Sequence, residues 1–341
     1  MRMEVYIAKR TCYALLTLLA LSTLVFILAR VLPGDPALMA AGPRAPDWVV
    51  EKIREELNLD EPLHIQYILW FKSLLKGDLG YSIHTRRSVT YDVLELLPAS
   101  MEMILLAAVF EVVGAFILGT LAGRYANKLP DYLTRFFAYI GISMPAFAWA
   151  IIFQLLFTWM FPIFPTYGRL SAHIVAPPKI TGFLTIDSLI TGRFDAFRDA
   201  LWHMVLPALA LCIGGMAQDA RIIRSGMVEN AGKDYIALTR AFGLPERLVM
   251  FKYLLKPSII PAVTVMGMDV AALLSNAFVV EIVYGWPGFS KYGIETMLRT
   301  DLNAIVAVVL VIGLIFVVAN IIVDVIVAYL DPRIRLVERG E

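Results

Sequence analysis

Two carboxylates, Glu111 and Asp269, lie well inside long apolar stretches of the sequence. An ionisable side chain at the centre of a membrane helix costs about 2.5–3.5 kcal/mol on insertion scales, so it is expected to face the bundle interior or a wet path. Two interpretations stay open. The acids line a path and meet amino or hydroxyl groups of a solute, or each makes a structural hydrogen bond to a neighbouring helix. Glu281 is a third candidate, for an outer gate beside Trp286-Pro287-Gly288.

A charged segment, residues 229–257, separates two apolar stretches and has the pattern of helix, break and helix. Asp234 suits the first turn of a helix, where negative charge is favoured. Gly243 can adopt a positive φ and end that helix, and Pro245 suits the start of the next one. Ala241 allows close approach of another backbone. The pattern favours docking onto a soluble partner; the alternative is a helix lying among lipid headgroups.

The sequence lacks the motifs for phosphate binding and for metal binding. The nearest approach to a phosphate-binding loop runs from Gly226 to Lys233, but it has one residue too many between its glycines and Asp234 after the lysine. The four histidines and two cysteines are scattered, which gives no metal-ligand spacing. We therefore expect no catalytic residue, cofactor or metal in this chain. A net charge of +1 gives no reason to expect a nucleic-acid partner.

The elements that must carry these residues are membrane helices. The chain is 59% apolar and only 17% charged, outside the range of ordinary soluble domains. About 20 mostly apolar residues cross a bilayer. The sequence predicts an all-α, single-domain polytopic protein over residues 1–341, with six transmembrane helices at about 11–30, 101–123, 136–161, 204–224, 258–283 and 304–330. The first is too long for the core of a signal peptide, so we expect an uncleaved anchor. Pro145 predicts a kink in the third.

The placement of basic residues predicts the orientation. With the N-terminus inside, the inner segments hold 16 of the 30 Lys and Arg residues and the two shorter outer loops hold only six. We therefore expect both termini and the segment 229–257 to be cytoplasmic. The outer loops are then residues 33–98, with a helix near 47–57, and residues 162–200. They either receive an external partner or only cap the bundle.

The charged segment resembles the EAA loop of ABC importer permeases, and motifs along the chain resemble the first permease subunit of the dipeptide, oligopeptide and nickel importers. The resemblance rests on Asp234-Tyr235-Ile236, Arg240-Ala241-Phe242-Gly243 and Ile260-Pro261 in the loop, and elsewhere on Pro33-Gly34-Asp35-Pro36, Gly77-Asp78-Leu79-Gly80, His203-Met204-Val205-Leu206-Pro207, Glu281-Ile282-Val283-Tyr284-Gly285-Trp286-Pro287-Gly288, Asn320, Asp324 and Asp331-Pro332-Arg333-Ile334. The usual family pattern is not kept at Ala237, Thr239, Phe242, Tyr253 and Pro257. We expect docking to survive these departures, with detailed contacts to the ATPase that differ from those of the family.

The resemblance implies a type I ABC importer fold in the cell membrane of a bacterium or archaeon. Its expected partners are lipid, a second homologous permease subunit, two ABC ATPase subunits that carry ATP and Mg²⁺, and an external solute-binding protein. The ATPase-coupling residues would be Glu229, Asp234, Tyr235, Arg240, Ala241, Gly243 and Leu244. The expected cargo is di- or oligopeptides, with oligosaccharides or nickel complexes as alternatives. A self-sufficient secondary transporter or channel, and an intramembrane enzyme, are the competing classes.

Overall fold

A computed structural model describes residues 3–31, 36–42, 45–56 and 58–330, and these contain helices but no strand. The motif residues Pro33-Gly34-Asp35 and Asp331–Ile334 lie outside the described residues. The elements in order are α1 (Met3–Val31), α2 (Pro36–Ala41), α3 (Asp47–Glu56), α4 (Leu63–Leu75), α5 (Val89–Arg124), α6 (Leu129–Ser143), α7 (Ala146–Gln154), η1, a π-helix (Leu155–Met160), α8 (Leu184–Ile190), α9 (Phe194–Ala231), α10 (Asp234–Ala241), α11 (Glu246–Leu248), η2, a second π-helix (Val249–Leu255), α12 (Lys256–Val283), α13 (Phe289–Leu298) and α14 (Leu302–Leu330).

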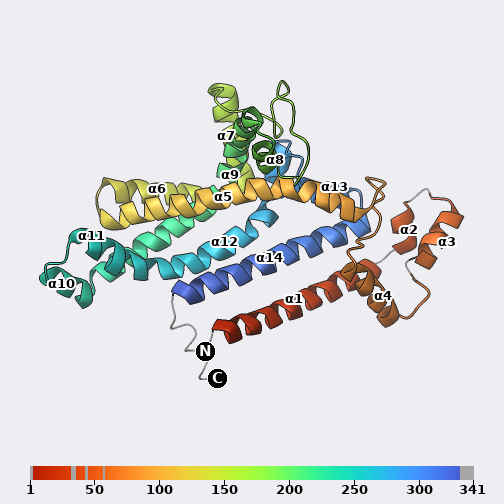
Figure 1. The fold of residues 1–341 in the computed structure, drawn as a ribbon, viewed down its shortest axis with the longest axis horizontal. Helices are drawn as coiled ribbons and strands as arrows, with labels where there is room; N and C mark the ends of the chain where they lie inside the picture. The colour runs from red at the N-terminus through yellow and green to blue at the C-terminus, as the bar shows by residue number, and fades with distance from the viewer. Residues whose placement is uncertain (1–2, 32–35, 43–44, 57, 331–341) are drawn as a thin grey trace.

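Five stretches of helix in the described part are long and apolar enough to cross a membrane, and a sixth span results if one bent pair is counted. Helices α5, α12, α14 and α1 lie side by side in this order, although they are far apart in the sequence. Helix α5 also packs along α9 (Figure 1). The helices are longer than the predicted spans because polar residues at their ends continue the helical backbone: α5, for example, begins at Val89 rather than near residue 101. The helix expected near 47–57 is α3.

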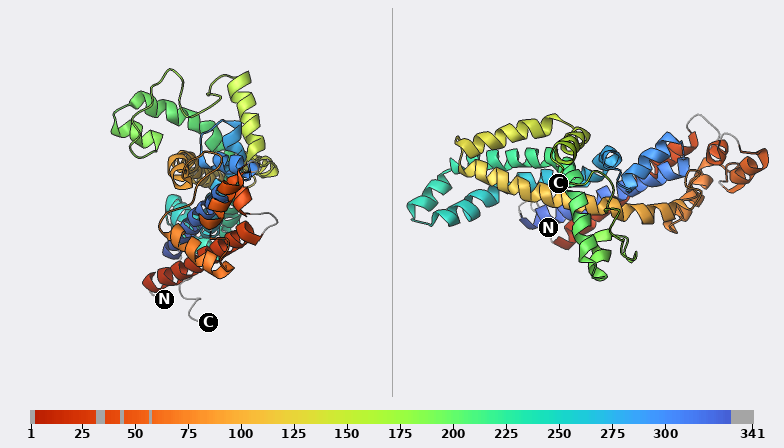
Figure 2. Two further views of the ribbon diagram at one scale, coloured as in Figure 1. Left: turned by 90° about the vertical axis from the view of Figure 1, so that its right-hand side faces the viewer. Right: turned by 90° about the horizontal axis from the view of Figure 1, so that it is seen from above.

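The stretch 136–161 is not one continuous helix. Helices α6 and α7 meet at 107°, far more than a kink. Pro145 has no backbone N–H, and it disfavours helical backbone at the preceding Met144, which is extended at φ −123° and ψ 140°. Helix α7 and the segment around α8 consequently stand out from the layer of long helices, and Figure 2 shows them diverging.

Close contact between α5 and α9 depends on two glycines. A Cβ added to Gly119 would lie 2.7 Å from Cβ of Ile223, and one added to Gly123 would lie 2.7 Å from Cβ of Met227. Small residues four apart allow two membrane helices to approach closely. Gly119 and Gly123 therefore allow α5 to pack closely against α9, the helix against which Glu111 also lies.

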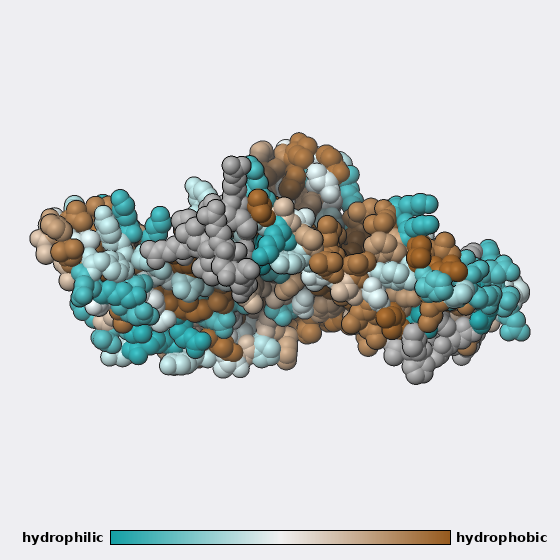
Figure 3. Space-filling view, turned by 90° about the horizontal axis from the view of Figure 1, so that it is seen from below, coloured by the Kyte–Doolittle hydropathy of each residue, from teal (hydrophilic) through white to brown (hydrophobic). Residues whose placement is uncertain are grey.

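The two ends of the molecule differ from its middle. Helices α10 and α11 form one end of the long axis and α2 to α4 the other, and α1 begins and α14 ends toward the α10 end (Figure 1). On the face seen in Figure 3, hydrophilic side chains gather toward both ends and hydrophobic ones between them. This distribution is the one expected of a bundle whose middle lies in lipid.

Candidate functional site

The segment 229–257 forms a short exposed arm at the α10 end. Asp234 is the first residue of α10, after an extended Lys233 at φ −82° and ψ 146°. Ile236 is fully buried and anchors the helix. Leu238 is exposed and Phe242 is 76% exposed, so an apolar edge faces away from the bundle. Of the apolar residues in the first turns of α10, Ile236 is therefore a packing residue, whereas Tyr235 and Leu238 are exposed.

Gly243 ends α10 in a Schellman motif. Its φ is +73°, its N–H donates to the carbonyl of Arg240 at 2.9 Å, and the Leu244 N–H donates to the carbonyl of Thr239 at 3.3 Å. A Cβ on Gly243 would meet no atom within 4 Å, so the requirement for glycine comes from the backbone conformation alone.

Two ion pairs brace the arm on its exposed side. Arg240 Nη2 lies 2.8 Å from Glu246 Oε1 and so bridges the Gly243 break, and Lys233 Nζ lies 3.2 Å from Glu229 Oε1. The side-chain hydrogen bond to Glu246 raises the pKa of Arg240 above its usual value. Six of the seven predicted coupling residues are exposed; Leu244 instead packs against the cluster that includes Val249.

The second half of the segment departs from the expected α-helix. Pro245 precedes α11 as predicted, but residues 249–255 are a π-helix. Val249, Met250 and Leu254 are buried, whereas Leu248 and Phe251 are exposed. The i→i+5 bonds of a π-helix turn the side chains through a smaller angle per residue than an α-helix does, which changes the buried face.

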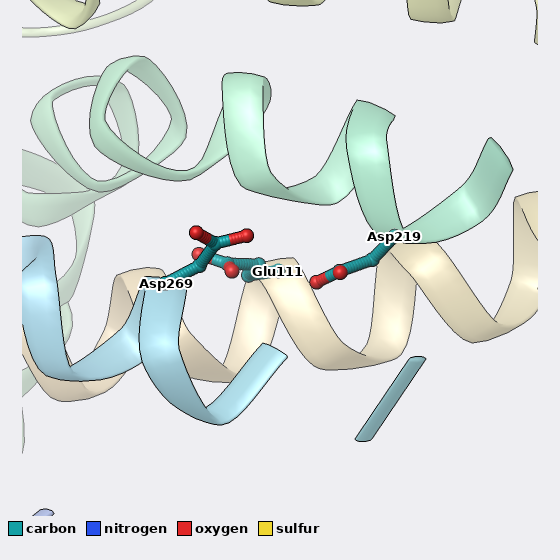
Figure 4. A group of neighbouring side chains, drawn as sticks. All are labelled: Glu111, Asp219 and Asp269. Atoms are coloured by element: carbon teal, nitrogen blue, oxygen red, sulfur yellow. The ribbon is translucent and has the colours of Figure 1, made fainter. Parts of the chain in front are cut away.

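Helices α5, α9 and α12 bring three carboxylates together in the interior. Glu111 and Asp269 are joined by Asp219, and oxygen atoms of the three lie within 4.8 Å of one another (Figure 4). Glu111 is 1% exposed, Asp219 is fully buried and Asp269 is partly buried. We refer to Glu111, Asp219 and Asp269 as the carboxylate cluster.

The cluster has few partners. Glu111 Oε1 and both carboxylate oxygens of Asp219 have no hydrogen-bond partner within the described part of the chain. Gln218 donates to Asp269 Oδ2 at a long 3.5 Å. A cavity of about 200 Å³ borders the cluster, lined by Glu111, Ile142, Leu211, Gly214, Gly215, Gln218, Asp269, Leu273 and Asn276. A second cavity of about 380 Å³ shares Leu211, Gly214, Gly215 and Asn276 with it.

Glu281 lies elsewhere and is fully buried. It accepts hydrogen bonds from the Ser100 hydroxyl and, at 2.7 Å, from the backbone N–H of Lys291. Trp286 Nε1 donates to the carbonyl of Ala99 at 2.9 Å beside it. These contacts tie the turn after α12 to α5 and enclose the Glu281 side chain completely.

Asp219 is the member that sequence reasoning missed. It stands near Arg221 and Arg224, at the charged end of the apolar stretch 204–224. The available signal was its acid side chain inside that span, the same feature that singled out Glu111 and Asp269.

Comparison with known proteins places the chain in a family. Residues 115–336 match the model of the binding-protein-dependent transport system inner membrane component, and residues 3–104 match the model of the N-terminal part of such membrane components. The chain is 36% identical to the probable D,D-dipeptide transport system permease protein DdpB of Escherichia coli, covering 96% of this chain and 97% of that one.

Other relatives also align over nearly their whole length. The dipeptide transport system permease protein DppB of Alkalihalophilus pseudofirmus is 33% identical, covering 98% of this chain and 100% of the relative. The glutathione transport system permease protein GsiC of Salmonella paratyphi A is 32% identical, covering 97% and 98%. Together with the all-helical type I permease fold, these matches show that the chain belongs to the family of binding-protein-dependent transport system inner membrane components, as a multi-pass ABC transporter permease of the cell membrane.

Proposed function

We propose that this permease forms half of the translocation path for di- or oligopeptides in an ATP-driven importer. The observation that carries the proposal is the nearly full-length similarity to permeases of dipeptide and glutathione transport systems. A second homologous permease supplies the other half, two ABC ATPase subunits bind ATP and Mg²⁺, and an external solute-binding protein delivers the peptide. Oligosaccharides and nickel complexes are the alternative cargoes.

The arm at 229–257 docks on an ATPase subunit. In support, Phe242 and Leu238 give an exposed apolar edge beside charged residues, which suits a groove on a soluble protein better than water. The Schellman cap at Gly243 and the Arg240–Glu246 pair hold the edge in one shape. A rigid arm can transmit ATPase movement to α9 and α12, between which it lies in the chain.

The proposal places this arm in the cytoplasm with both termini. The distribution of Lys and Arg supports it. So does the fold, because α1 begins and α14 ends toward the end of the molecule that bears α10 (Figure 1). The helices α2 to α4 at the other end then face outward, where a solute-binding protein would dock.

Uptake by the reconstituted importer tests the proposal. The permease, its partner permease and the ATPases of the same importer are placed in proteoliposomes with the cognate binding protein. They are given labelled di- and tripeptides, an oligosaccharide panel and nickel chelates. We expect ATP-dependent uptake of peptides. Uptake of sugar or nickel complexes alone would refute the cargo, and uptake by this chain without ATPases would favour a self-sufficient transporter.

Docking is tested separately with variants of the arm. Gly243→Asp, or deletion of 234–243, should abolish co-purification of the ATPases and reduce uptake to background. Gly232→Ala is the matched control, since Gly232 has an ordinary φ of −84° and nearest contact at 3.7 Å. Normal ATPase binding and uptake by the deletion variant would refute docking at this arm.

A further inference from the structure

We propose that the carboxylate cluster of Glu111, Asp219 and Asp269 binds a primary ammonium group on the translocation path. The inference rests on the proposed function in one respect: the natural source of the ammonium is then the amino terminus or lysine side chain of the peptide in transit. The site itself is argued from the cluster's unpaired oxygens, their spacing and the neighbouring cavity.

The first argument is the unmet hydrogen-bonding capacity of the cluster. Glu111 Oε1 and both oxygens of Asp219 are buried acceptors without a donor in the described chain. A buried acceptor left unpaired costs about 1–3 kcal/mol, and more when it is charged. No basic side chain is paired with Glu111, Asp219 or Asp269 among the ion pairs of the described residues. A donor that arrives from outside would satisfy these atoms.

The spacing of the oxygens suits an ammonium group. An ammonium has three N–H donors and no acceptor, and it meets carboxylates at about 2.7–2.9 Å. Three acceptors in tetrahedral directions around one nitrogen at that distance lie about 4.6 Å apart. One carboxylate oxygen from each of the three residues lies within 4.8 Å of the other two, and the three residues belong to three helices, so the spacing is compatible with one shared ammonium. A Mg²⁺ or Ca²⁺ ion would require six or more oxygens at about 2.0–2.6 Å.

The neighbouring space distinguishes an organic cation from a bare ion. The cavity beside the cluster is about 200 Å³ and shares Leu211, Gly214, Gly215 and Asn276 with the neighbouring cavity of about 380 Å³. A water molecule occupies about 30 Å³, so the first cavity alone holds far more than one ion. Gln218 and Asn276 add amide groups to its wall. A chain attached to the ammonium therefore has room and polar partners.

The decisive measurement is ligand-induced thermal stabilisation of the complete importer in lipid nanodiscs. The probe is methylammonium; the matched controls are tetramethylammonium, which carries the same charge without N–H donors, and Ca²⁺ or Mg²⁺ at equal ionic strength. A ligand that binds only the folded state raises its stability with concentration. We expect a saturable rise in midpoint with methylammonium and none with tetramethylammonium.

Isosteric variants locate the effect. Asp269→Asn and Glu111→Gln should each reduce the methylammonium-induced rise at least threefold. Asp324→Asn should leave it unchanged, because Asp324 is an acid of another span that pairs with Arg10. A larger rise with Ca²⁺ or Mg²⁺ than with methylammonium would make this a metal site, and absence of a saturable methylammonium effect in the unmodified protein would overturn the proposal whatever the variants do.

Transport decides whether the site lies on the path. Asp269→Asn and Glu111→Gln should lower peptide uptake at least tenfold while assembly and ATPase binding stay normal. Unchanged uptake in variants that have lost the methylammonium effect would remove the site from the path. If the unmodified importer moves no peptide, the proposed cargo fails, whereas the methylammonium measurement still decides whether the cluster binds an ammonium.

Discussion

Gly215 of α9 lies directly against the carboxylate of Glu111 on α5: a Cβ added to Gly215 would stand 2.5 Å from Glu111 Oε1. An ordinary contact between carbon and oxygen is about 3.3–3.6 Å. The absence of a side chain at Gly215 is therefore what allows Glu111 to reach the cluster. The adjacent Gly214 has no such constraint, since the nearest atom to its added Cβ is 3.8 Å away.

This difference gives a prediction with a built-in control. Gly215→Ala should displace Glu111 by about 1 Å, at a packing cost of about 1–3 kcal/mol. It should lower peptide uptake and weaken the stabilisation by methylammonium. Gly214→Ala adds a methyl group to the cavity wall without reaching Glu111, so it should leave the stabilisation by methylammonium close to that of the unmodified importer. Equal effects of the two substitutions on the methylammonium-induced rise in thermal midpoint would show that the contact with Glu111 is not what matters.

The sequence was sufficient for features set by local chemistry. The apolar stretches located the membrane helices, and Gly243 followed by Pro245 located the break between α10 and α11. Each of these depends on the hydropathy or backbone preference of neighbouring residues. The site required more. Glu111, Asp219 and Asp269 meet only because α5, α9 and α12 pack in one particular rotation, and the sequence carries no periodic signal for that rotation.

Two other features could not be predicted from the sequence, because they too depend on how distant parts of the chain pack together. Pro145 predicts a disturbance of the helix, but a 107° turn depends on what α6 and α7 each pack against. From the local sequence alone, Glu281 cannot be distinguished from an exposed acid near a turn. Its buried contact is with Ser100, which is 181 residues away in the chain and meets it only in the folded protein.

Glu281 should therefore behave as a structural residue. Glu281→Ala leaves the buried Ser100 hydroxyl and the Lys291 N–H without their acceptor, which we expect to cost about 1–3 kcal/mol of unfolding free energy. Glu281→Gln retains an acceptor oxygen and should cost less. Thermal midpoints of the purified importer check the order. A gate would give the opposite pattern: normal midpoints with altered uptake per assembled importer.

The ion pair of Asp131 and Arg224 should contribute strongly to the joining of α6 to α9. Two hydrogen bonds of 2.9 and 2.8 Å connect the side chains, and Asp131 is fully buried. Asp131→Asn leaves the guanidinium without its counter-charge, and we expect a loss of about 3 kcal/mol, near the lower limit for breaking a buried pair because Arg224 keeps some exposure.

Thermal midpoints in detergent measure this loss. The control is Arg193→Ala, which breaks the exposed pair with Asp195 and should change the midpoint little. A midpoint for Asp131→Asn equal to that of the control would mean that the buried pair adds no more than an exposed one.

Asp187 predicts acid sensitivity of the segment that leads into α8. Burial opposes its ionisation, but hydrogen bonds from the Thr181 hydroxyl and from the backbone N–H groups of Thr181, Ile180 and Gly182 outweigh that effect and lower the pKa of Asp187. The carboxylate therefore stabilises the fold fully above the unfolded pKa of about 3.9, and the stabilisation is lost as pH falls through the lower folded pKa.

Hydrogen exchange at these amides measures the effect. Protection factors of Ile180, Thr181 and Gly182, corrected for the intrinsic pH dependence of exchange, should be constant down to about pH 4 and then fall. Asp187→Asn should lower them already at neutral pH and remove most of the acid dependence, because no proton is taken up at this position. The exposed Asp195→Asn should keep the profile of the unmodified protein. An unchanged acid profile in Asp187→Asn would assign the sensitivity to another group.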